Sequence, residues 1–270
     1  MHSRRLFLLF AIVLASAGSL TAQATADQSR LVLSVNAGYI PGTSGWRVSG
    51  QPLYDDQFTD PIHIDTLSIN RQIRPSLTFG AQAMYFPGDH IGFMGEAQLI
   101  GLGFRDSCSR TYATLSSRNT SVCENINNSE TSASAVLVGA GAIYRINSRG
   151  DISPFARVGL GGVISTQSSI GMIGRFPNPE GESVEVELYP DEASTRITGG
   201  ATLALGFSAL IGRGYQVRWE VTDRIVGVRS ITGPTVQDGA PPPTALRYRH
   251  LFGIQIGFDV VLERRRGRRY

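Results

Sequence analysis

Ionisable and amide side chains that could form a network lie on one face of several segments in which apolar and polar residues alternate. Glu96, Arg157 and Arg218 carry opposite charges on this face. Opposite charges that face one another in a dry interior can pair and hydrogen-bond. The candidate network consists of Glu96, Gln98, Arg157, Arg218, Glu220 and Asp259. Such a network would either fill an enclosed space or line a narrow path for small solutes.

The cysteines Cys108 and Cys123 lie close together in one long connection. In an exported chain, two cysteines form a disulfide by default, with free thiols or a metal site as the alternatives. Zinc would need further ligands, and no His is adjacent to either cysteine. A disulfide closing a loop of this size would restrict the unfolded chain by about 3 kcal/mol. The predicted role of this bond is to shape a surface segment.

The histidines do not form a recognisable catalytic motif. Hydrolysis would need a nucleophile beside a base, usually Ser with His and a carboxylate. His63 lies in a long connection, His90 in a short turn, and His250 on an apolar face, whereas His2 belongs to the leader. The sequence therefore predicts no enzymatic activity, no cofactor and no metal.

A dense acidic stretch lies within the connection that spans residues 164–195. It consists of Glu180, Glu182, Glu185, Glu187, Asp191 and Glu192. The Asp-rich spacing of a calcium loop is missing, so solvated acid on a surface hairpin is the simpler interpretation. Val184, Val186 and Leu188 alternate with the acids, which predicts strands within this connection.

The N-terminus reads as a signal peptide over residues 1–24, with cleavage possible up to residue 26. A short basic region precedes an apolar run that is too short to cross a bilayer as a helix, and small residues follow it. A charged fraction of 17% and a mean hydropathy of −0.03 exclude both a disordered chain and a polytopic helical membrane protein. Residues 27–263 form the predicted folded domain. The basic tail, 264–270, could contact anionic phosphate groups or acidic periplasmic partners, or stay disordered.

Eight segments of the mature chain alternate with a period of two, the pattern of strands with one apolar and one polar face. They cover residues 31–39, 76–85, 91–99, 135–145, 154–164, 197–211, 215–222 and 248–262. Their connections alternate in length: the short turns are 87–90, 147–151 and 212–214, and the long ones are 40–73, 105–131, 165–195 and 226–245. An even number of antiparallel strands with this sorting predicts an all-β, eight-stranded, up-and-down transmembrane barrel. It would have four long extracellular loops and three short periplasmic turns.

The apolar face of these strands should meet lipid, because a charge at the bilayer midplane of a barrel costs about 2 to 4 kcal/mol. The charged face must then point inward. Outward aromatic residues fall near both ends of the strands, where amphipathic rings favour the headgroup level. The predicted aromatic girdle consists of Tyr39, Tyr85, Phe93, Tyr144, Tyr215, Tyr248 and Phe258. A soluble periplasmic ligand-binding barrel would invert the two faces, and it is the structural alternative.

Three motifs resemble the outer membrane protein β-barrel domain family, which includes the OmpA transmembrane domain. The segment 154–162 is similar to that family's Pro-aromatic-x-x-x-Gly-x-Gly strand, and 218–223 to its Arg-x-Glu-x-x-Asp strand. Near the C-terminus, Gln255, Gly257, Val260 and Leu262 resemble the signal read by the barrel-insertion machinery. Leu262 stands where the family usually has an aromatic residue.

Together, pattern and resemblance predict an integral protein of the bacterial outer membrane with a structural or surface-interacting role. An eight-stranded barrel is just wide enough for side chains to fill it, so a closed lumen is expected. A narrow porin-like channel for small solutes is the functional alternative. The expected partners are outer-membrane lipids, the insertion machinery and an extracellular partner that binds the loops. Nucleic acid is not expected in that compartment, and the protein is expected to be a monomer.

Overall fold

The fold is known from a computed structural model that describes most of the mature chain. The described residues are 30–55, 63–112, 116–146, 151–190, 197–212, 214–236 and 240–263. The predicted signal peptide, the basic tail and two members of the acidic stretch, Asp191 and Glu192, lie outside the described residues. Among the described segments, no helix is both long and apolar enough to cross a membrane.

Eight antiparallel strands close into a barrel, as the alternation predicts. They are β1 (Arg30–Ile40), β4 (Ser76–Phe86), β5 (Ile91–Gly101), β8 (Ser134–Arg145), β9 (Ile152–Ser165), β12 (Ile197–Gly212), β13 (Tyr215–Ile231) and β14 (Thr244–Glu263). Each strand pairs with its neighbours in the chain order of the barrel, and β1 closes it by pairing with β14 from Arg30↔Glu263 to Tyr39↔Ile254. Because the barrel is closed, each of its strands is hydrogen-bonded to a neighbour on both sides, and no strand edge is left unpaired in the bilayer.

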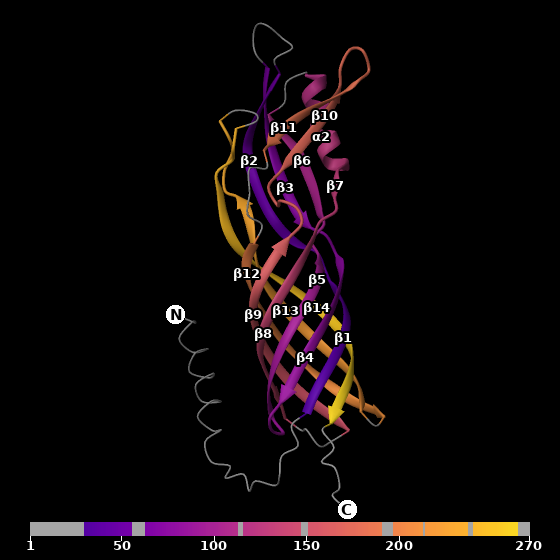
Figure 1. The fold of residues 1–270 in the computed structure, drawn as a ribbon. Coiled ribbons are helices and arrows are strands. Elements are labelled where there is room, and N and C mark those ends of the chain that lie inside the picture. Colours follow the sequence, from indigo (N-terminus) through magenta and orange to yellow (C-terminus); the bar gives the residue numbers. More distant parts are fainter. Residues whose placement is uncertain are drawn as a thin grey trace, which may run out of the picture.

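The barrel wall shows the alternation most clearly in β5. Along this strand, outward residues such as Ile91 and Phe93 are exposed, whereas Met94 and Glu96 are buried inside. Every barrel strand is slightly longer than predicted, and two exceed their predicted ends by several residues: β13 reaches Ile231, and β14 begins at Thr244. The β13–β14 hairpin therefore rises above the barrel rim on the side of the long connections (Figure 1).

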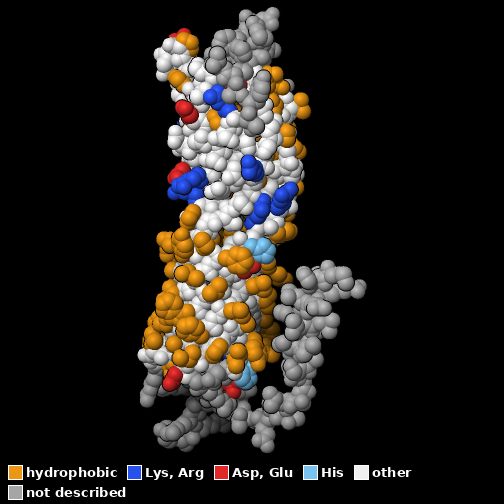
Figure 2. Space-filling view, turned by 180° about the vertical axis from the view of Figure 1, so that it is seen from behind, with side chains coloured by type: hydrophobic (Ala, Val, Ile, Leu, Met, Phe, Trp, Pro, Cys, Tyr) orange, Lys and Arg blue, Asp and Glu red, His pale blue; other side chains and the backbone are white. Residues whose placement is uncertain are grey.

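The outer surface of the barrel is apolar, as Figure 2 shows for one face. Leu160 and Leu205 are 70% and 68% exposed on this surface. All seven aromatic residues of the predicted girdle are also exposed, and Tyr215 stacks on Phe258 with ring centroids 5.8 Å apart. A soluble barrel would bury these rows and expose the charges, so the soluble alternative is wrong.

Three of the four long connections are folded segments rather than irregular loops. A four-stranded sheet contains β2 (Thr43–Asp55), β3 (His63–Ile73), β6 (Phe104–Tyr112) and β7 (Glu130–Thr131). Beside it lie helix α2 (Ser117–Asn128) and the hairpin of β10 (Met172–Pro177) and β11 (Ser183–Tyr189). We call these elements the head; they stand above the barrel at one end in Figure 1. The hairpin agrees with the strands predicted within the acidic connection.

The head has its own apolar core and a covalent tie. Trp46, Ile69, Val122 and Leu188, from four different elements, are buried together in this core. The predicted disulfide between Cys108 and Cys123 is present, with Cα atoms 5.4 Å apart, and it joins β6 to α2. Such a core explains why the connections fold: they are long enough to bury apolar surface against one another.

Strand β7 pairs with only the first two residues of β6 and leaves the rest of that strand edge open. Helix α2 supplies hydrogen-bond partners to part of this open edge. The backbone N–H of Cys108 donates to Asn127 Oδ1 at 2.6 Å, and Asn127 Nδ2 donates to the Cys108 carbonyl at 3.0 Å. The side-chain amide thus replaces a neighbouring strand at this position. At the other end of α2, Ser116 Oγ caps the helix by accepting from the backbone N–H of Asn119 at 3.2 Å.

Candidate functional site

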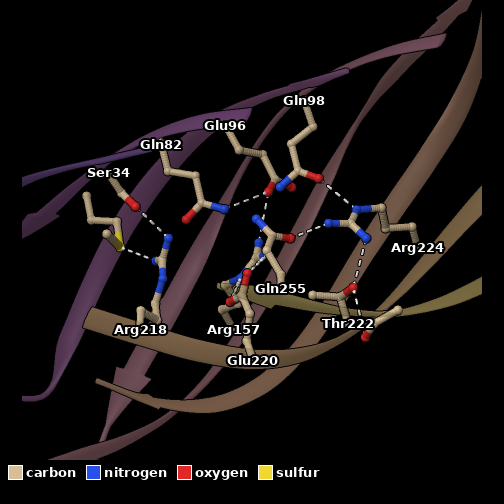
Figure 3. A network of polar contacts seen from close by, with 12 residues as sticks. Ser34, Gln82, Glu96, Gln98, Arg157, Arg218, Glu220, Thr222, Arg224 and Gln255 are labelled. Carbon is tan, nitrogen blue, oxygen red and sulfur yellow. Dashed lines mark hydrogen bonds and ion pairs between the residues drawn. The ribbon is translucent and has the colours of Figure 1, made fainter. Parts of the chain in front are cut away.

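The centre of the barrel lumen holds an arginine between two carboxylates. Arg157, on β9, donates from Nε and Nη2 to both oxygens of Glu220, on β13, at 2.9 Å each. Its Nη1 donates to Glu96 Oε2, on β5, at 2.8 Å. The three side chains are almost completely buried. One guanidinium therefore ties three strands together across the lumen (Figure 3).

A second arginine, Arg224, continues the network toward the head. Its Nε donates to Gln98 Oε1 at 2.7 Å, its Nη1 donates to Thr222 Oγ1 at 2.8 Å, and its Nη2 donates to Gln255 Oε1. The sequence analysis does not include Arg224, because its predicted segment 215–222 stops two residues before this arginine. Extending the two-residue alternation by one step would have placed it on the polar face.

A third arginine, Arg218, lies toward the turn end of the network. Its Nη2 donates to Ser34 Oγ at 2.8 Å, and Asp259 Oδ1 lies 3.7 Å from the same nitrogen. Gly257 makes room for this side chain, since a Cβ there would come within 3.2 Å of Arg218 Nε. The structure thus places all six residues of the candidate network in the lumen, with Arg218 and Asp259 beside the central cluster.

Two apolar layers enclose this polar layer. The lower layer, at the end with the short turns, consists of Val32, Met84, Phe86, Met94, Ile143 and Phe155. The upper layer, beneath the head, consists of Ile40, Ile73, Ile100, Leu102, Phe104, Ala135, Leu137, Val163, Val226, Val228 and Leu251. An ion that crossed either layer would lose most of its hydration to apolar side chains, although the lower layer also contains the guanidinium of Arg145 over the Phe86 ring. The layers therefore oppose a continuous aqueous path.

The head contains a buried ion pair that the sequence analysis did not identify. Arg71 on β3 and Asp106 on β6 are direct cross-strand neighbours. Arg71 Nε and Nη2 donate to the two Asp106 oxygens at 2.6 Å each, and both side chains are buried. The same guanidinium donates to the carbonyls of Ser169 and Gly171 at 3.0 and 2.9 Å, and it lies over the Trp46 ring. Arg71 therefore fixes the segment before β10 onto the sheet.

A glutamine connects three of the long connections. Gln51 on β2 accepts from Tyr189 Oη at 3.0 Å and from the backbone N–H of Thr235 at 2.9 Å. Its Nε2 donates to Thr235 Oγ1 at 2.7 Å. Burial raises the pKa of Tyr189, so its hydroxyl stays a donor. The head is thereby held together by polar contacts as well as by its apolar core.

A polar cleft of about 540 Å³ opens on the head between α2, β7 and the segment before β10. Amide, hydroxyl and charged groups line it, including Asn125, Asn128, Gln167, Ser168 and Glu187. The Arg71–Asp106 pair contributes to its wall, and the two charges neutralise each other. This arrangement suits hydrogen bonding to a polar ligand more than it suits binding of an ion.

The remaining candidates are the residues of the proposed insertion signal and the histidines. Gln255 and Gly257 of the proposed insertion signal line the lumen, whereas Leu262 is 46% exposed at the strand end. His90 Nδ1 lies 2.8 Å from the Arg145 carbonyl, and His250 Nδ1 lies 2.7 Å from Asp223 Oδ2 on the outer surface. Within the described ranges, no group of three or more His, Cys, Asp or Glu is placed to hold a metal.

Comparison with known proteins identifies the family. The family described as outer membrane protein beta-barrel domain matches residues 10–238. No curated protein sequence matches the chain. Among solved structures, OprG from Pseudomonas aeruginosa is similar at 9% identity and a TM-score of 0.51, over 88% of this chain and 98% of OprG.

Two further structures resemble the chain more weakly. AlkL has 14% identity and a TM-score of 0.43, over 93% of this chain and 98% of AlkL. Ail, the attachment invasion locus protein of Yersinia pestis, has 10% identity and a TM-score of 0.35, over 87% of this chain and 99% of Ail. The matched family is consistent with the closed barrel and with its apolar exterior. The chain belongs to the outer membrane protein beta-barrel domain family, and it is a protein of the bacterial outer membrane.

Proposed function

We propose that this protein is a closed, non-enzymatic barrel that anchors the head at the cell surface for binding an extracellular partner. The observation that carries the proposal is the order of polar and apolar layers along the lumen. A hydrogen-bonded polar centre around Arg157 lies between two apolar layers, so the barrel interior acts as a packed core. The functional surface is then the head.

The head has the rigidity that a binding surface needs. The disulfide, the Arg71–Asp106 pair and the Gln51 contacts connect all four long connections to one another. Preorganised groups bind with a smaller loss of conformational entropy than mobile loops do. The polar cleft is the candidate binding surface, because amides and hydroxyls converge on it from α2 and from the segment before β10.

Planar-bilayer recording tests the closed lumen against the porin-like alternative. We expect the purified wild-type protein to give no steady conductance. A porin of known conductance in the same bilayers serves as the positive control. A steady wild-type conductance that is abolished by Arg157→Ala would contradict the proposal and support a narrow channel through the network.

A matched pair of substitutions tests the cleft. Gln167→Trp would fill it, whereas Ser49→Trp places the same side chain on an exposed site of β2, the strand at the far edge of the sheet. Cells that display each variant would be applied to arrays of oligosaccharides and extracellular-matrix proteins. We expect the wild type and Ser49→Trp to share a binding profile that Gln167→Trp loses. Equal profiles for all three would contradict a role for the cleft.

A further inference from the structure

Several side-chain amides on the polar cleft of the head have no partner inside the protein. Asn125 and Asn128 are three residues apart on α2 and therefore lie on one face of the helix, and Gln167 comes from the segment before β10. Within the described part of the chain, none of these three side chains forms a hydrogen bond. Two other amides of the same helix, Asn119 and Asn127, bond to the backbone of β2 and β6 instead. The helix thus uses one pair of amides for the fold and presents another pair to the cleft.

A carboxylate without a cation lies on the same cleft. Helix α2 and the β10–β11 hairpin lie beside each other in the head (Figure 1), and Glu187, on β11, is an exposed residue of the cleft wall. Among the described residues, Glu187 takes part in no ion pair and no hydrogen bond. The strand register places it directly opposite Ile173 on β10, which also lines the cleft and is 46% exposed. The hairpin therefore offers the cleft a free acceptor beside an apolar side chain.

The charges of the cleft disfavour an anionic ligand. Two arginines line it within the described ranges, and each already has a carboxylate. Arg71 Nη2 lies 2.6 Å from Asp106 Oδ2, and Arg175 Nη2 lies 2.7 Å from Glu185 Oε1. A phosphate, sulfate or carboxylate group would find no free cation here and would be repelled by the charge of Glu187.

The free groups of the cleft match the chemistry of a sugar. A primary amide donates through its N–H groups and accepts through its oxygen, and a sugar hydroxyl also does both, so amides and hydroxyls can bond in pairs. A carboxylate only accepts, and a hydroxyl is a donor that satisfies it without adding a charge. The C–H faces of a sugar ring are apolar and can pack on Ile173. The cleft volume of about 540 Å³ also lies within the usual range for small-ligand sites, about 300 to 1,000 Å³.

A peptide fits the cleft less well than a sugar does. Proteins commonly hold an extended peptide by adding it to a strand edge, with pockets for alternate side chains, or dock the apolar face of a helix in a hydrophobic groove. In this cleft the free groups belong to side chains, and polar residues form most of the lining. Ile173 alone does not form a pocket for an apolar anchor.

We infer that the polar cleft binds an uncharged oligosaccharide through the amides of Asn125, Asn128 and Gln167 and the carboxylate of Glu187, with Ile173 against a ring face. The inference rests on the proposed function, in which the cleft is the binding surface of the head, and it adds the class of ligand. It also sets the selectivity of the site. The same sugar chain with sulfate groups or sialic acid should bind more weakly, because each brings a negative charge toward Glu187.

Glycan arrays with a matched pair of substitutions test this inference. The mature protein in nanodiscs of a zwitterionic lipid would be applied to arrays that hold uncharged glycans together with their sulfated and sialylated derivatives. We expect binding to uncharged glycans that Glu187→Gln weakens about ten-fold, because hydrogen bonds to a charged acceptor are about twice as strong as neutral ones. Glu187→Gln should also narrow the preference over sulfated glycans. Glu124→Gln removes the same charge from an exposed site of α2 outside the cleft, and it should leave binding unchanged within about two-fold.

A second variant and a second ligand class separate this inference from the broader proposal. Asn125→Asp keeps the size of the side chain but removes its N–H donors, and it should weaken glycan binding as well. Equal weakening by Glu187→Gln and Glu124→Gln, or a preference for sulfated or sialylated glycans, would overturn the inference. Binding to a matrix protein that carries no glycan, lost in Gln167→Trp, would overturn the sugar but keep the cleft as the binding surface. Absence of any binding that Gln167→Trp removes would contradict both. Glu187 is exposed and unbonded, so its replacement leaves no buried group unpaired, and heat-modifiable gel migration verifies that each variant is folded.

Discussion

Two buried arginines, one in the lumen and one in the head, have similar chemistry in different surroundings. Arg157 bonds two carboxylates from separate barrel strands. Arg71 bonds a single carboxylate on the adjacent strand and two backbone carbonyls of a connection. The lumen arginine therefore joins distant parts of a closed wall, whereas the head arginine fixes a local segment. The same kind of ion pair can therefore stabilise a whole barrel or only one of its connections.

The two tryptophans allow the two regions to be followed separately. Trp46 is buried in the head, and Trp219 is 50% exposed on the outer barrel surface. A Trp219→Phe background leaves fluorescence from the head alone, and a Trp46→Phe background leaves fluorescence from the barrel alone. Each substitution below can be measured in both backgrounds.

The largest effect is expected from Arg157→Ala. It leaves Glu96 and Glu220 buried without their cation, and removing one partner of such a pair costs about 3 to 5 kcal/mol. We expect the free energy of unfolding of the barrel to fall by this amount in urea titrations followed through Trp219. Arg105→Ala, at an exposed site, is the control and should change it little. An unchanged urea midpoint of the barrel in Arg157→Ala would contradict the idea that the lumen arginine stabilises the whole barrel wall.

Removal of the disulfide should act on the head alone. Replacing Cys108 and Cys123 with Ser releases β6 from α2, and loss of a loop closure of this size costs about 3 kcal/mol. The expected result is a lower urea midpoint for Trp46 and an unchanged one for Trp219. Chemical reduction of the wild type should reproduce the shift. A parallel fall in both midpoints would mean that head and barrel unfold as one unit.

Arg71→Ala should have a smaller effect because Asp106 lines the polar cleft, from which water can reach its carboxylate once the guanidinium is gone. We expect a loss of about 2 kcal/mol that is confined to the head. Limited proteolysis should then cut the segment between residues 166 and 171 faster than in the wild type, while the barrel stays resistant. Faster cleavage elsewhere, without cleavage in this segment, would contradict the anchoring role of Arg71.

The smallest effect is a pH dependence at Tyr189. Burial raises the pKa of Tyr189 above its ordinary value of 10.0, so the folded head favours the neutral phenol. Its contribution is present below pH 10 and is lost as the pH rises, because the unfolded chain ionises first. We expect the Trp46 midpoint to fall at alkaline pH. Tyr189→Phe should lower the free energy of unfolding of the head by about 1 kcal/mol at neutral pH and remove this residue's alkaline contribution. An identical alkaline fall in both proteins would contradict the prediction.

The sequence predicts the barrel wall well because a closed wall forces strict alternation on each strand. Glu96 and Arg157 could be placed on the inner face without any knowledge of their partners. Their pairing also depends on how the inner surface curves, which alternation does not encode. Arg224 was missed only because its strand was ended too early, whereas the direct contact between Arg157 and Glu220 required the closed barrel.

The head was harder to predict because its strands are interrupted. In β2, the register shifts between Ser44 and Trp46 and again between Ser49 and Gln51, and Gly50 adopts a φ of +81°. Each shift exchanges the two faces of the strand and breaks the two-residue period. The pairing of Arg71 with Asp106 depends on a register between strands from different connections, and no local pattern reports it.

The amide of Asn127 has a consequence for a crowded membrane. Outer-membrane proteins stand side by side, so an open strand above the bilayer could pair with the same strand of a neighbour and begin a fibril. Asn127 occupies both backbone groups of Cys108 on the open edge of β6, and the disulfide holds its helix in place. At this position, the Asn127 side chain leaves no free backbone group through which the strands of neighbouring copies could pair.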